Sequence, residues 1–142
     1  MAAYTKYENF IENLLNKVLD AFGATETWKA VIHTDAPVVA TDNVLGDLTQ
    51  ISGNNGYTTD GSDISFNSTR TGGTVTATAT DVVWTASGGN LGSSTTGRYV
   101  SIYDSTPATK YLKASYDYGG VFTVASGETF TLDFGASLWT AA

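Results

Sequence analysis

Few residues in this chain could carry out chemistry. It has one histidine, His33, and no cysteine, so a nucleophilic triad with an imidazole base would have to include His33. His33 ends the apolar run WKAVIH, where a packed or hydrogen-bonded histidine is more common than a catalytic base. Without thiols, disulfides and thiolate zinc sites are excluded. We therefore expect no catalytic residue, no cofactor and no metal site, and we interpret the chain as a non-enzyme.

A second candidate for chemistry is the segment Asp60-Gly-Ser-Asp63, which places two carboxylates and a hydroxyl in one turn. Oxygen ligands of this kind bind Ca²⁺, but no glutamate follows at the spacing of an EF-hand. Aspartate also accepts backbone N–H bonds and tolerates tight turns. The segment is therefore interpreted as a turn rather than as a calcium site.

The charge of the chain bears on its partners. Fourteen acidic residues face seven lysines and arginines, for a net charge of −7, and the cations are scattered along the sequence. Binding to phosphate needs clustered cations, so we expect no nucleic-acid partner. No apolar run approaches the length of a membrane span, and no secretory signal is visible. We expect no membrane partner, and we expect the protein to be in the cytoplasm of the cell that makes it.

The elements that must position any site begin with a predicted amphipathic helix over residues 5–22. Thr5 and Glu8 have the spacing of a capping box, and Gly23 stands where a helix would stop. Large apolar residues recur at helical spacing. This stripe consists of Tyr7, Phe10, Ile11, Leu14, Leu15, Val18, Leu19 and Phe22.

The rest of the chain has the pattern of short antiparallel strands separated by glycine turns. Alternation is clear in Phe130, Leu132 and Phe134, and again from Leu112 to Asp117, which reads as a half-buried strand. The expected strands cover residues 28–33, 48–51, 63–66, 74–80, 82–85, 98–103, 111–116, 121–124 and 129–134. We predict a mainly β protein of one domain (1–142): an antiparallel β-sandwich or jelly-roll-like domain (27–142) with one N-terminal amphipathic helix.

The strand over residues 74–80 stands out because its inward side chains are small and its outward ones are all threonine. Two interpretations stay open: an edge or outer strand, or a strand that packs against a neighbouring subunit. Some aromatic residues also cannot be assigned to the core by pattern, and exposed aromatics on a sandwich would suit carbohydrate binding. These are Tyr57, Tyr99, Tyr103 and Trp139.

Several segments occur in an order that resembles a known group of proteins. They are 28–34 (WKAVIHT), 43–57 (NVLGDLTQISGNNGY), 63–66 (DISF), 81–89 (DVVWTASGG), 98–104 (RYVSIYD) and 127–134 (GETFTLDF). The chain resembles small virion structural proteins of tailed bacteriophages. The resemblance implies a particle component, with capsid decoration (cement) as the preferred role, and it implies no functional residues.

The resulting expectation is a decoration protein on the outer capsid surface of the virion. Its partners would be the major capsid protein and further copies of itself, with a homotrimer favoured. The alternatives are a tail or head–tail connector component, and a receptor- or carbohydrate-binding virion module. The contact segments would be 1–6, 37–46 and 74–80. The interface candidates are Tyr4, Pro37, Thr74, Thr76, Thr78 and Thr80.

Overall fold

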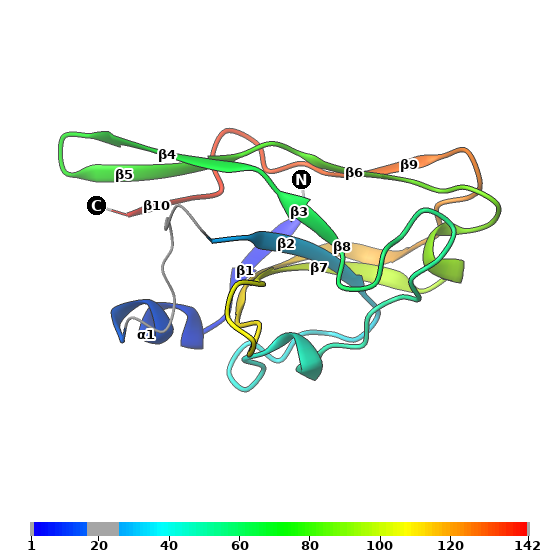
Figure 1. Cartoon of the computed structure of the whole chain (residues 1–142), viewed down its shortest axis with the longest axis horizontal. Coiled ribbons are helices and arrows are strands. Elements are labelled where there is room, and N and C mark those ends of the chain that lie inside the picture. Colours follow the sequence, from blue (N-terminus) through cyan, green and yellow to red (C-terminus); the bar gives the residue numbers. More distant parts are fainter. Residues whose placement is uncertain (1, 17–25, 142) are drawn as a thin grey trace.

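The fold is mainly β, with antiparallel sheets and one α-helix among the residues that the computed structural model describes, which are 2–16 and 26–141. This confirms the predicted fold class (Figure 1), while the jelly-roll detail is not confirmed. The elements are β1 (Ala3–Lys6), α1 (Asn9–Leu15), β2 (Trp28–His33), η1 (Leu45–Asp47), β3 (Ser62–Ile64), β4 (Phe66–Thr71), β5 (Thr74–Ala79), β6 (Val82–Thr85), η2 (Leu91–Ser93), β7 (Gly97–Asp104), β8 (Leu112–Phe122), β9 (Thr129–Leu132) and β10 (Trp139–Ala141).

Three sheets form two layers. The largest has five strands in the order β1-β8-β7-β2-β3, and it faces a three-stranded sheet, β10-β5-β4, and a two-stranded ribbon, β6-β9 (Figure 1). The main core lies between the layers. Trp28, Ile32 and Ile102 from the large sheet pack there with residues such as Trp84 and Leu132 from the smaller sheets.

The other face of the large sheet is also covered. Residues 34–49, here called the covering loop, place Leu45 and Leu48 over it, next to Tyr7, Val31 and Tyr103. Burial on both faces corrects one prediction. The strand that starts at Leu112 was expected to be half-buried, but every residue from Leu112 to Tyr116 is buried, because the covering loop and the N-terminal segment pack against it.

The N-terminal helix starts later than the sequence pattern indicated. Thr5 belongs to β1, which pairs with β8, so the predicted Thr5–Glu8 capping box is wrong, and Glu8 makes no side-chain capping bond. The edge of β8 offers Thr5 a ladder of backbone hydrogen bonds that outweighs its capping tendency. The sandwich therefore includes β1 and does not begin at residue 27. The predicted continuation of the helix over 17–22, and its stop at Gly23, lie outside the described residues.

The predicted strands agree with the structure except at weakly apolar segments. Strands β2 and β6 have the expected bounds, but residues 48–51 contribute only an isolated bridge between Gln50 and His33. The expected strand 121–124 is largely the end of β8, which extends to Phe122. Strand β5 lies between β4 and β10, so the edge interpretation of the threonine-rich strand is wrong. The two strands beside β5, the polar β4 and the short β10, were not predicted as full strands from the sequence.

Candidate functional site

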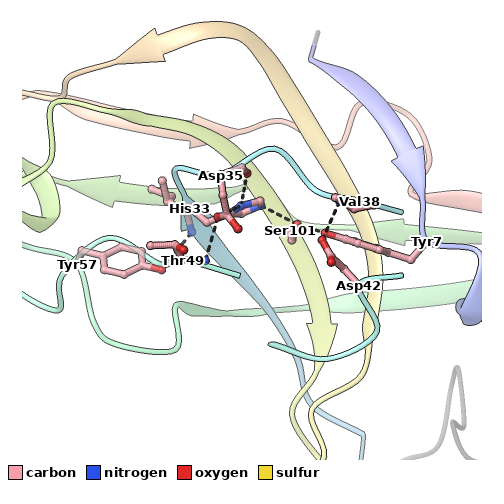
Figure 2. Close-up of polar contacts among 9 residues, drawn as sticks. Tyr7, His33, Asp35, Val38, Asp42, Thr49, Tyr57 and Ser101 are labelled. Atoms are coloured by element: carbon pink, nitrogen blue, oxygen red, sulfur yellow. Dashed lines mark hydrogen bonds and ion pairs between the residues drawn. The ribbon is translucent and has the colours of Figure 1, made fainter. Parts of the chain in front are cut away.

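The strongest candidate site surrounds His33, at the end of β2 (Figure 2). His33 is 0% exposed, and its ring stacks on Tyr99 with 5.5 Å between ring centroids. Its Nε2 lies 2.8 Å from Ser101 Oγ, and its Nδ1 lies 3.0 Å from the carbonyl and 3.2 Å from the carboxylate of Asp35. Ser101 Oγ in turn lies 2.9 Å from the hydroxyl of Tyr7. Four residues from three separate segments thus form one polar chain.

The partners determine where the hydrogens lie. Nδ1 of His33 meets only acceptors, so it carries the ring hydrogen and donates to Asp35. Nε2 then accepts from the hydroxyl of Ser101, and Ser101 accepts from the hydroxyl of Tyr7. Asp35 also accepts the N–H of Thr49 at 2.9 Å. The chain therefore runs in one direction, from Tyr7 through Ser101 and His33 to Asp35.

Burial keeps the two titratable rings of this hydrogen-bonded network, those of His33 and Tyr7, neutral. It lowers the pKa of His33, and the hydrogen bond and charge of Asp35 oppose that effect only in part. Burial also raises the pKa of Tyr7 to about 12, although hydrogen bonding with Ser101 and Ser115 acts to lower it. At neutral pH the imidazole is uncharged and the phenol keeps its hydrogen. These are the protonation states that the direction of the hydrogen bonds requires.

Ser101, His33 and Asp35 have the connectivity of the triad of serine hydrolases. However, Ser101 and His33 are 0% exposed, so a substrate has no route to the hydroxyl. A pocket of about 260 Å³ lies close by, lined by Thr5, Ala36, Pro37, Val39, Tyr99, Ser115 and Asp117. Neither the serine nor the histidine lines it. The arrangement can fasten the covering loop and Tyr7 to β2 and β7, and it does not present a nucleophile.

This chain of residues was not predicted, because 68 residues separate His33 from Ser101. The expectation that His33 is a packed, hydrogen-bonded residue is confirmed. One signal could have found its partner. Ser101 alternates with Tyr99 and Tyr103 along β7, so a small polar residue shares a strand face with two large aromatic residues.

The predicted interface residues fall into two groups. Tyr4 is exposed on β1 and meets the Tyr116 ring edge-on, while its neighbour Thr5 and the half-buried Pro37 line the same pocket. Thr74, Thr76 and Thr78 are half-buried on β5, and Thr80 is exposed just beyond it. The structure therefore brings residues 2–6, the described part of the first segment, next to the 37–46 segment, and it places the 74–80 segment in the other layer.

The other candidates from the sequence are accounted for by ordinary contacts. Lys110 Nζ lies 2.7 Å from Asp60, and Lys29 Nζ lies 2.9 Å from Asp63, so both carboxylates of the predicted turn are paired with cations. Among the described residues, no three potential metal ligands of the His, Cys, Asp or Glu type gather in one place. Within the same residues, no helix is both long and apolar enough to cross a bilayer.

Three of the four aromatics that the pattern left unassigned are core residues. Tyr57 is buried, and its hydroxyl accepts the N–H of Ile32. Tyr99 is buried against His33, and the hydroxyl of Tyr103 donates to the carbonyl of Asp60. Their burial assigns these three residues to the core, which the sequence pattern had left open. Of the fourth, Trp139, the structure describes the backbone in β10.

Four of the six exposed large apolar side chains among the described residues lie on the N-terminal segment and the covering loop, and the other two are Val83 and Val121. We call Tyr4, Ile11, Leu15 and Val38 the N-terminal surface. The covering loop is held to α1 by a hydrogen bond from Glu8 N–H to the carbonyl of Val39. Strand β1 forms one end of the large sheet, all its residues are exposed, and no described strand pairs with its outer edge.

Comparison of the chain with protein-family models, with curated proteins and with solved structures gives no match.

Proposed function

We propose that this protein is a non-enzymatic structural component of a tailed-phage virion, and that it decorates the outer capsid surface as a cement protein. The virion assignment is supported by the sequence segments that occur in the same order as in small phage virion proteins. The exposed edge of β1 beside the N-terminal surface carries the proposal that the chain docks on another protein.

The mode of docking follows from that edge. An unpaired strand edge binds an extended segment of a partner through backbone hydrogen bonds, and side chains beside it provide specificity. All four residues of β1 are exposed, and Ile11, Leu15 and Val38 supply apolar area on the elements that follow. Exposed ion pairs contribute only about 0–1 kcal/mol each, and this chain has only seven lysines and arginines. Apolar burial and strand pairing therefore dominate the interface.

The partners proposed are the major capsid protein and further copies of this chain, with a trimer favoured. A trimer at a threefold position engages several capsid subunits at once. Such multivalent attachment raises the apparent affinity well above that of a single contact. Tyr4 and Pro37 belong to the contact surface in this proposal. The Thr74, Thr76, Thr78 and Thr80 face contributes through side chains only, because β5 has strand neighbours on both edges.

The absence of enzymatic activity is part of the proposal. Its support is the inaccessibility of Ser101 and His33. A tail or head–tail component remains the alternative, since the same edge could join ring neighbours. The receptor- or carbohydrate-binding alternative loses support, because Tyr57, Tyr99 and Tyr103 are buried.

Copy number tests the proposal. The protein is quantified in purified particles by gel densitometry against the major capsid protein. Hundreds of copies per particle support decoration, a few dozen support a tail component, and a few support an adhesin. Particles lacking the protein should release DNA at a lower temperature than intact ones. Unchanged capsid stability together with lost adsorption to cells would overturn the decoration assignment.

A further inference from the structure

A lysine is buried among carboxyl groups and aromatic rings at the start of β8. The Lys113 side chain is 3% exposed, that of Asp104 is 0% exposed, and Nζ lies 3.7 Å from Asp104 Oδ2. The same Nζ lies 3.9 Å from the centre of the Trp28 ring and 5.2 Å from that of Phe10. Lysine is almost never buried this deeply without a specific partner, so this pair calls for a chemical explanation.

A backbone irregularity aims the lysine at Asp104. Along the β7–β8 ladder, Ile102 pairs with Ala114 and Tyr103 pairs with Leu112, which leaves Lys113 as the additional residue of a bulge. A bulge turns its extra side chain away from the regular alternation of the strand. Asp104 ends β7 and pairs with Trp28 of β2, so the two side chains meet on the face that carries the Trp28 ring.

A second carboxyl group adjoins the pair. Burial raises the pKa of Glu26, and the hydrogen bond and the charge of neighbouring Asp104 raise it further. Two adjacent carboxyls share a proton more readily than they both ionise. Oδ1 of Asp104 accepts the N–H of Thr106 at 3.0 Å, which fixes the carboxyl plane and leaves Oδ2 toward the lysine. The cluster thus contains an amine, a carboxyl held in place, and a neighbouring acid that can carry a proton.

We propose that Lys113 and Asp104 condense into an intramolecular isopeptide bond, with Glu26 as the proton carrier. Nζ first passes a proton to the Asp104 carboxylate, then attacks Cγ of that carboxyl group and forms the C–N bond. Glu26 takes a proton from the nitrogen and delivers one to the departing hydroxyl. The C–O bond then breaks, and one water leaves. The sum is amine plus carboxylic acid to amide plus water, with no oxidation and no other reactant.

The surroundings favour this step in two ways. An ion pair in an apolar site loses hydration that its mutual attraction only partly restores, whereas an amide carries no charge to desolvate. Groups held side by side react as if at very high concentration, and Nζ is held 3.7 Å from Oδ2 of the carboxyl group whose Cγ it would attack. A void of about 10 Å³ adjoins the lysine, lined by residues that include Tyr4, Ile102 and Leu138. That is about the size of one water, which matches the leaving molecule.

The bond would join β7 to β8 across the loop of residues 105–111. These strands lie next to each other in the large sheet (Figure 1), so the link would fasten the end of the hairpin that the bulge interrupts. This inference concerns the folded chain itself and does not depend on the virion assignment.

The test is the mass of the full chain. Protein incubated at neutral pH for a day after purification is denatured and weighed by intact mass spectrometry. The expected result is a chain lighter by one water molecule, and Lys113→Met and Asp104→Ala variants at full mass. Glu26→Gln should slow the loss of water at least tenfold. Lys110→Arg, which alters the solvent-accessible pair with Asp60, should lose water as the wild type does.

Trypsin locates the bond. Cleavage after Arg98 and Lys110 but not after Lys113 should yield peptide 99–110 joined to peptide 111–142. A wild-type chain at full mass would overturn the proposal and leave an ordinary buried ion pair. Loss of water confined to a linear peptide, as in succinimide formation at an aspartate, would overturn it equally.

Discussion

Replacement of Ser101 by alanine is the sharpest perturbation of the buried polar chain. Ser101 Oγ lies 2.8 Å from His33 Nε2 and 2.9 Å from the Tyr7 hydroxyl, so its removal leaves one buried acceptor and one buried donor without a partner. An unsatisfied buried group costs about 1–3 kcal/mol. We therefore expect Ser101→Ala to lower the free energy of unfolding by about 2–6 kcal/mol, a large share of the about 5–15 kcal/mol typical of a domain.

The matched control is Ser115→Ala. Ser115 pairs with Ser101 across β7 and β8 and is also buried. Its Oγ acts on the pKa of the Tyr7 hydroxyl, but it makes no hydrogen bond of ordinary geometry among the described residues. Urea unfolding at neutral pH should show a loss below about 1 kcal/mol for this control. A double-mutant cycle that combines Ser101→Ala with Tyr7→Phe should give an interaction energy of about 0.5–3 kcal/mol between the two positions. Equal losses for the two serine variants, or no coupling with Tyr7, would refute the role assigned to the chain.

Three further predictions follow from single positions. Folding lowers the pKa of His33 from 6.5, so the stability contributed by neutral His33 is complete above pH 6.5 and declines below it, by up to about 1.4 kcal/mol per pH unit. Urea unfolding of His33→Gln over the same pH range should lack this pH-dependent loss. Leu15 is 77% exposed, so Leu15→Asp should change stability by less than about 0.5 kcal/mol yet weaken binding to particles in a co-sedimentation assay. Val83→Asp, an exposed position on β6 outside the proposed contact surface, should leave binding unchanged. A Cβ on Gly61 would collide with the backbone of β2, while one on Gly72 meets nothing although both have positive φ; thermal melts should therefore show Gly61→Ala to be the more destabilising by at least about 2 kcal/mol.

Strands were predictable from the sequence where the residue types and their alternation both favour a strand. Trp28–His33 and Val82–Thr85 are apolar, β-branched or aromatic, and nothing competes with strand formation there. Phe130, Leu132 and Phe134 alternate with exposed residues, and the pattern correctly predicts which side faces the core. Local propensity and burial agree in these segments.

Where tertiary pairing decides the structure, the sequence pattern was insufficient. Residues 3–6 form a strand because β8 offers them an edge, and Phe66–Thr71 forms one because β5 lies beside it, although its outward residues are polar. The site was beyond reach for the same reason. Ser101 and His33 meet through the register of β2 and β7, in which His33 lies opposite Tyr99 and Val31 lies opposite Ser101, and no local rule predicts that register.

The pairing of β1 also determines the order in which the sheet can be completed. Ala3 lies opposite Asp117, and Lys6 lies opposite Ala114, so β1 can pair only after β8, which comes much later in the sequence, has been made. During synthesis this segment leaves the ribosome long before its partner exists, and closing so long a loop is slow. The vacant edge of β8 is then open to the β1 segment of any nearby copy. Final closure of the sheet is therefore the step at which self-pairing and exchange between chains compete, and protein concentration determines the balance.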